Sequence, residues 1–111
     1  MKKGEIFWAE LSPTVGSEIS KNRPVLIVSN DINNEYASTI TILPITSTTT
    51  KIYPFEVILE TNEGGLSNQS KVKANQIRTI DKLRIKGKLG KLSKSKMDEV
   101  EKAIKIHLDI N

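Results

Sequence analysis

Two polar residues beside predicted strands have side chains that suit phosphate chemistry. Arg23 ends a Gly/Ser/Lys/Asn loop and directly precedes Pro24 and the apolar run Val25–Val28. Proline restricts the residue before it to extended conformations, so the backbone at Arg23 is rigid. A guanidinium is a planar fork of donors that matches a phosphate. Thr46 lies where the third predicted strand meets its loop, and its hydroxyl can donate to a phosphate oxygen.

The residues alone leave simpler interpretations open. Arg23 could pair with a surface acid, and Thr46 could satisfy a turn. Glu18 is the nearest candidate carboxylate in the first loop, and it could equally be a solvated side chain. The chain has no cysteine, which excludes disulfides, thiolate metal sites and cysteine nucleophiles. The one histidine, His107, falls in a predicted helix, where a packed structural histidine is the simpler interpretation. The sequence therefore predicts no metal site.

The elements that must position these residues are mostly strands. The apolar residues are largely β-branched, which favours strands over helices. We expect a turn at 31–38 and one helix, with Ser93 or Ser95 as its cap and an apolar stripe from Met97 to Leu108. The fold class is therefore mainly β (α+β), a small antiparallel barrel or sheet with a C-terminal helix. The predicted strands are 4–11, apolar on both faces and hence central; 25–28, buried; 39–43, interrupted by Pro44; 55–59, half-buried; and 71–80, bent near Asn75.

Length and charge limit the classes of protein. A chain of 111 residues suits a single domain, 1–111. No segment approaches the ~20 apolar residues of a membrane span, so we expect a soluble cytoplasmic protein without a membrane partner. The net charge is +4, but residues 71–96 hold ten basic side chains and one acid, hence 10 − 1 = +9. Such a segment is consistent with a nucleic-acid footprint, a solvated Lys-rich face or an acidic protein partner.

Several linked motifs resemble the MazF/PemK toxin family. Gly16-Ser17-Glu18 is followed after four residues by Arg23-Pro24 and the apolar run that ends in Ser29-Asn30-Asp31. Two further matches are Pro44-Ile45-Thr46 and the segment 76–81, Gln-Ile-Arg-Thr-Ile-Asp. The opening Gly4-Glu5-Ile6, the following Leu11-Ser12-Pro13 and the end of the chain from Met97 to Leu108 also fit. The similarity runs in order along essentially the whole chain.

The resemblance implies a fold and an activity. It implies an SH3-like, CcdB/MazF-like barrel that forms a homodimer. It implies a sequence-specific endoribonuclease toxin that cuts single-stranded RNA without a metal or other cofactor and stops translation. The ribose 2′-OH would attack the adjacent phosphorus and leave a 2′,3′-cyclic phosphate and a 5′-OH. A cognate, MazE-like antitoxin would neutralise the toxin by inserting a flexible segment into its RNA groove.

The resemblance also assigns roles to residues. The family's catalytic arginine and threonine fall on Arg23 and Thr46, and Glu18 is a further hypothesis as proton acceptor. Some PemK-type members use an arginine and an aspartate just before the Gln-x-Arg-Thr motif. Those positions here are Lys73 and Asn75, and an amide cannot take that proton. The predicted RNA-binding residues are Ser17, Glu18, Lys73, Asn75 and Gln76.

Two other classes remain as alternatives. CcdB-like proteins share this fold and poison DNA gyrase without chemistry, through a tryptophan near the C-terminus. The only tryptophan here is Trp8, which argues against that class. The second alternative is a non-catalytic, basic RNA-binding barrel.

Overall fold

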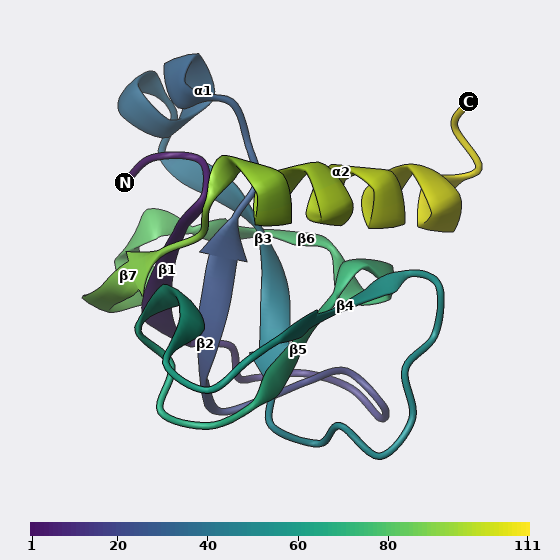
Figure 1. Ribbon diagram of the computed structural model, residues 1–111. Helices are drawn as coiled ribbons and strands as arrows, with labels where there is room; N and C mark the ends of the chain where they lie inside the picture. Colours follow the sequence, from purple (N-terminus) through teal and green to yellow (C-terminus); the bar gives the residue numbers. More distant parts are fainter.

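The computed structural model covers residues 1–111 and shows one strongly curved sheet with a long helix across one end (Figure 1). All strand pairs are antiparallel, in the order β4-β5-β3-β2-β1-β7, and β6 also pairs with β3. The predicted α+β class with an antiparallel sheet and a C-terminal helix is therefore confirmed. The strands are β1 (Glu5–Glu10), β2 (Asn22–Ile27), β3 (Thr39–Thr46), β4 (Glu56–Leu59), β5 (Ser70–Lys73), β6 (Arg78–Asp81) and β7 (Ile85–Lys91). The helices are α1 (Asp31–Tyr36) and α2 (Lys94–Leu108), with 3-10 turns η1 (Glu63–Gly65), η2 (Ala74–Gln76) and η3 (Lys82–Arg84).

Strand β3 is the branch point of the sheet. One of its edges pairs with β2, while the other pairs with β6 over Thr39–Ile42 and with β5 at Ile45–Thr46. The prediction that Pro44 ends this strand is wrong. Pro44 falls in the gap between the β6 and β5 ladders, a position where a missing N–H costs little. The strand therefore continues to Thr46. The predicted bend near Asn75 is confirmed, because η2 separates β5 from β6.

Apolar residues fill both faces of the central strands, as expected for β1. One cluster lies between the sheet and α2, and it includes Ile6, Leu26 and Val100. A second cluster on the opposite face includes Ala9, Val25 and Ile27. Alternate residues of β1 and β2 thus point into different cores. This double burial fixes the register of β2, and with it the position of Arg23 at the start of that strand.

The C-terminal helix begins where the sequence predicts. The Ser93 hydroxyl accepts a hydrogen bond from the N–H of Lys96, which is an N-cap contact. The apolar stripe is shorter than predicted. Met97, Val100 and Ala103 are buried, but His107 and Leu108 are exposed because the helix extends past the sheet. The His107 ring lies 6.0 Å from the Phe55 ring, so its packing is peripheral.

Two elements are absent from the sequence-based prediction. Residues 31–36 form α1 rather than a turn, with the Asn30 side chain as N-cap. Residues 85–91 form β7, which pairs with β1. Gly90 in this strand has a packing role, because a Cβ there would lie 2.6 Å from the carbonyl oxygen of Gly64. The turn η1 thus packs backbone to backbone against β7. Neither helix combines the length and the apolar composition that a membrane span requires.

Candidate active site

Arg23 and Thr46 line one cavity of about 270 Å³. The β2–β3 ladder ends at the pair Val25 and Pro44. Continuing the same register by two residues places Arg23 opposite Thr46. Arg23 is near the start of β2 and Thr46 is the last residue of β3. The cavity therefore lies at the end of the sheet, where residues from both faces reach it.

Arg23 has no partner within the protein. It is exposed, and the ion pairs of the structure all involve other cations. The other two arginines of the chain, Arg78 and Arg84, donate instead to backbone carbonyls at the end of β1 and in the loop that follows it. The simpler interpretation, an arginine paired with a surface acid, is therefore wrong for Arg23. Its five N–H donors are free for an anionic ligand.

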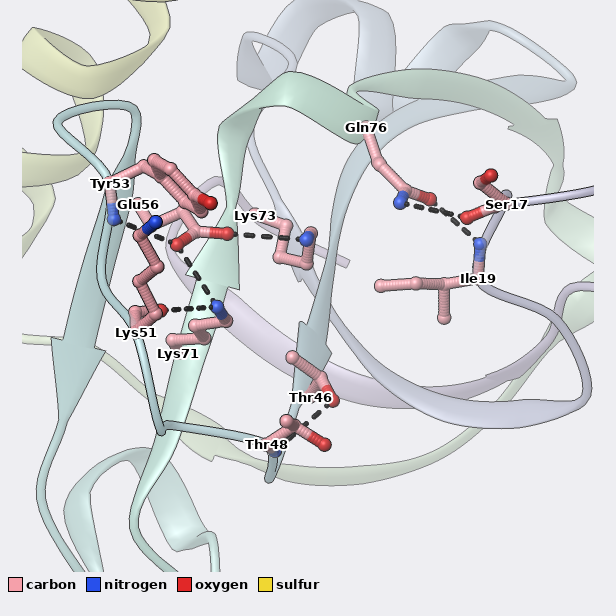
Figure 2. A network of polar contacts seen from close by, with 10 residues as sticks. All are labelled: Ser17, Ile19, Thr46, Thr48, Lys51, Tyr53, Glu56, Lys71, Lys73 and Gln76. Carbon is pink, nitrogen blue, oxygen red and sulfur yellow. Dashed lines mark hydrogen bonds and ion pairs between the residues drawn. The ribbon is translucent and has the colours of Figure 1, made fainter.

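The hydroxyl of Thr46 keeps its proton available. Its Oγ1 accepts a hydrogen bond from the N–H of Thr48 at 3.3 Å (Figure 2). A hydroxyl that only accepts can still donate to a second oxygen. The same contact bends the chain so that Ser47 and Thr48 line the cavity beside Thr46.

The rest of the lining is neutral. It contains no carboxylate, so Arg23 faces no competing acid inside the cavity. Uncharged hydroxyl and amide groups can donate to or accept from a bound oxygen without adding charge. The polar members besides Arg23 and Thr46 are Asn22, Ser47, Thr48, Ser67, Asn68 and Ser70, and the larger apolar members are Trp8, Ile45, Leu66 and Leu89.

Four of the five predicted RNA-binding residues line a second cavity of about 330 Å³. They are Ser17, Glu18, Asn75 and Gln76, and Ile77 and Arg78 complete the lining. The fold thus brings the first loop and the bend at η2 together, although they are far apart along the chain. Glu18 does not line the cavity of Arg23 and Thr46. One of its carboxylate oxygens accepts the N–H of Val15 at 2.6 Å.

Gln76 connects this second cavity to the first loop. Its side-chain oxygen accepts the N–H of Ile19 at 2.7 Å, and its amide nitrogen donates to the carbonyl of Ser17 at 3.3 Å (Figure 2). Both ends of the amide are therefore engaged with the backbone. Arg78, two residues on, donates to the carbonyl of Leu11. These contacts hold the loop that leads from β1 to Arg23.

Lys73 lies in neither cavity. Its Nζ is 3.2 Å from Oε2 of Glu56, and the Nζ of Lys71 is 3.0 Å from Oε1 of the same carboxylate. The Glu56 side chain is fully buried, although the sequence predicts a half-buried strand with this residue on the polar face. Burial by itself raises the pKa of Glu56, but the N–H of Tyr53 and the two ammonium groups outweigh it and lower the pKa.

The buried ion-pair network also reaches the loop after Thr46. Lys71 donates to the carbonyl of Lys51 at 2.8 Å, and Glu56 accepts the N–H of Tyr53 at 3.0 Å (Figure 2). The segment 47–55 is thus tied to the sheet at its far end. The sequence offers one signal for this network, because Glu56 alternates with apolar residues and Lys71 and Lys73 alternate in a later strand. It does not show that the Glu56 carboxylate is buried or that the two lysines reach it.

Most cationic side chains of the basic segment 71–96 contact other groups of the protein. All of its cations except Lys86 and Lys91 contact a carboxylate or a carbonyl of the protein. The count of charges along the sequence therefore overstates the free positive surface. Nowhere do three or more His, Cys, Asp or Glu side chains gather as metal ligands would.

A curved antiparallel sheet with a free guanidinium and a hydroxyl in a carboxylate-free cavity has the donors that an anion requires. Comparison with known proteins identifies the family of this fold and site. Residues 2–108 match the family model described as PemK-like, MazF-like toxin of type II toxin–antitoxin system. The chain therefore belongs to this family.

Relatives and solved structures agree with the family match. The chain is 38% identical to Endoribonuclease MazF9 of Mycobacterium tuberculosis (strain ATCC 25618 / H37Rv), over 99% of this chain and 98% of that protein. It is 41% identical to Endoribonuclease MazF of Staphylococcus epidermidis, over 100% and 93%. MazF (Form-I) from Deinococcus radiodurans superposes with a TM-score of 0.86, at 26% identity and over 99% and 97% of the two chains. A MazE–MazF structure (Form-II) from the same organism gives 0.80, at 26% identity and over 100% and 97%.

Proposed function

We propose that this protein is a toxin of a type II toxin–antitoxin module and acts as an endoribonuclease on single-stranded RNA. The observation that carries the proposal is the cavity that Arg23 and Thr46 share, with Arg23 free of any partner. Family membership and the names of the two endoribonuclease relatives support the same activity.

The proposed reaction uses a nucleophile of the substrate. The ribose 2′-oxygen forms a bond to the adjacent phosphorus, and the bond from phosphorus to the 5′-oxygen breaks. The products are a 2′,3′-cyclic phosphate and a 5′-OH, with one proton lost from the 2′-OH and one gained by the leaving oxygen. Arg23 binds the phosphoryl oxygens as negative charge develops, and Thr46 adds a hydrogen bond. The pKa of arginine lies above ~12, so Arg23 stabilises charge rather than removing a proton.

The second cavity is the proposed continuation of the RNA path. Ser17, Glu18 and Asn75 offer hydroxyl, carboxylate and amide groups that can read base edges. Gln76 contributes mainly by holding the loop that carries Ser17. Lys73 retains its predicted role in RNA binding only if the RNA competes with Glu56 for its ammonium group.

The partners follow the same proposal. We propose a cognate, MazE-like antitoxin, supported by the MazE–MazF structure whose MazF-like chain has this fold. We also propose that residues 1–111 form a single toxin domain, that two copies form a homodimer, and that the protein acts in the cytoplasm, where messenger RNA is translated.

One assay tests the activity. The purified protein is incubated with a long single-stranded RNA in the presence of EDTA, and the 5′ ends of the fragments are sequenced. Discrete cuts that share a sequence support a metal-independent endoribonuclease. Retention of RNA without cuts supports the alternative of a non-catalytic binding barrel. Intact RNA together with inhibition of DNA gyrase supports the CcdB-like alternative, and either of the last two results overturns the proposal.

A further inference from the structure

Trp8 is more exposed than its place in the sheet predicts. It lies on β1, which pairs with strands on both sides, yet 39% of the residue is accessible. Ile6 and Ala9 on the same strand are fully buried. Single exposed apolar side chains are common on protein surfaces, so the exposure of Trp8 gains meaning only from the polar cavity beside it.

The exposed indole lines the cavity of Arg23 and Thr46. Its cross-strand partner is Pro24, the residue directly after Arg23. By strand alternation, Trp8 lies on the sheet face of Ile6, whereas Arg23 pairs with Ala9 and belongs to the other face. The two residues therefore meet only because the cavity opens at the end of the sheet. The indole of Trp8 and the guanidinium of Arg23 are adjacent but distinct parts of one cavity.

A nucleotide has the same two parts. Its phosphate is anionic, and its base is a flat aromatic ring that stacks on aromatic side chains. A phosphate bound by Arg23 at the end of the sheet places the attached nucleoside within reach of the face where Trp8 lies. At about 270 Å³ the cavity is slightly smaller than the sites of drug-sized ligands, which suits one base rather than several.

We propose that the indole of Trp8 is the stacking platform for the nucleobase next to the scissile phosphate. The inference rests on the proposed function for the identity of that phosphate. Stacking uses the face of a base, which every base has, so Trp8 holds the strand without selecting its sequence. The neutral polar groups of the cavity remain available to read the edges of the base.

Intrinsic fluorescence tests the contact directly, because Trp8 is the only tryptophan in the chain. The unmodified protein is titrated with short single-stranded deoxyoligonucleotides, which lack the 2′-OH and so cannot react by the proposed route. We expect saturable quenching of the emission. An abasic oligonucleotide of the same length and charge should leave the emission unchanged. Equal quenching by the abasic strand, or no quenching by the strand with bases, overturns the proposal.

The result is independent of cleavage. A protein that quenches with bases but never cuts RNA contradicts the nuclease and leaves the stacking contact in place. A protein that cuts RNA without any quenching contradicts the stacking contact alone.

Two variants separate stacking from simple packing. Trp8→Phe keeps an aromatic face and should cleave RNA with a KM close to that of the unmodified protein. Trp8→Leu keeps an apolar wall without a ring face, and should raise KM by about 5- to 150-fold, the range that corresponds to the loss of one base–aromatic stack. The kcat should change little, because Arg23 and Thr46 are intact.

Phe7→Leu is the matched control. Phe7 is the adjacent aromatic residue on β1, packs against the opposite core and does not line the cavity. This variant should keep the KM of the unmodified protein. An unchanged KM in Trp8→Leu, or a rise in Trp8→Phe as large as in Trp8→Leu, overturns the proposal once circular dichroism shows that each variant is folded.

Discussion

Lys71 is the cross-strand neighbour of Thr46 in the ladder between β3 and β5. The same lysine pairs with the buried carboxylate of Glu56 and binds the carbonyl of Lys51. The residue that carries the proposed catalytic hydroxyl is therefore a direct cross-strand neighbour of a member of a buried ionic network. This network fixes the loop that follows Thr46, so residues outside the cavity contribute to its shape.

The first prediction concerns the two proposed catalytic residues. Arg23→Ala and Thr46→Val should each lower kcat for RNA cleavage, because each removes a donor to the developing charge on phosphorus. The loss of one such donor typically lowers kcat by about 10²–10³-fold. Steady-state cleavage of a fluorogenic RNA measures the change. Both residues lie outside the buried cores, so the circular dichroism spectra should match that of the unmodified protein.

Lys86→Gln is the control for the loss of a positive charge. Lys86 is exposed, its side chain contacts no acid or carbonyl of the protein, and it does not line the cavity of Thr46. Its variant should retain most of the kcat. A folded Arg23→Ala protein with undiminished kcat would show that the site lies elsewhere.

The second prediction concerns the substrate. A deoxyribose at the cut position should abolish cleavage there, since the attacking oxygen would be missing, while deoxyribose at neighbouring positions should permit it. Mass spectrometry of the fragments should detect the 2′,3′-cyclic phosphate on the unmodified substrate. Cleavage after the modified sugar would exclude an internal nucleophile.

The sequence predicts the central strands and the last helix well, because their residues have only one way to bury their apolar atoms. Val25–Val28 is apolar throughout, and the Met97, Val100 and Ala103 stripe repeats with the period of a helix. It also singles out two candidates by their neighbours, Arg23 directly before Pro24 and the apolar run, and Thr46 directly before the polar loop 47–51. Two antiparallel neighbours then bring the pair together.

The missed features depend on tertiary contacts. The strand β7 contains Gly87 and Gly90 and three lysines, a composition that favours a loop, and it is extended because it pairs with β1. The helix α1 is only six residues long, and the cap at Asn30 is its main local signal. Glu56 looks like the polar half of an alternating strand, and only the fold shows that Lys71 and Lys73 approach it from β5. The sequence also does not show which cations lack a partner, because most of their partners are distant along the chain.

The third prediction concerns the stability that Glu56 provides. Glu56→Gln leaves Lys71 and Lys73 without their buried anion, and breaking such a pair typically lowers the free energy of unfolding by about 3–5 kcal/mol. Urea denaturation followed by circular dichroism measures the change. Glu35→Gln is the matched control, because Glu35 is an exposed carboxylate on α1 without an ion pair, and its effect should be within ~0.5 kcal/mol. Equal stability of the two variants would contradict the role of the network.

The fourth prediction is the pH dependence of that contribution. The pKa of Glu56 is lowered below 4.5 in the folded protein, so folding favours its ionised form. Its stabilising effect should be complete above about pH 4.5 and should be lost as the pH falls through the folded pKa. The difference in Tm between the unmodified protein and Glu56→Gln should therefore shrink only below this pH. A difference that shrinks between pH 5 and pH 8 instead would point to another titrating group.

The fifth prediction concerns Gln76 and the loop before Arg23. Gln76→Leu removes the acceptor of the Ile19 N–H and the donor to the Ser17 carbonyl, so the amide hydrogen of Ile19 should exchange with solvent faster. The loop leads into β2, and its loosening should raise KM for RNA more than it lowers kcat, because the backbone of Arg23 remains paired with Ala9 of β1. Gln69→Leu is the control, since the side chain of Gln69 contacts those of Thr49 and Glu60 and none in this loop. Faster exchange at Ile19 without any change in KM would mean that the loop does not bind RNA.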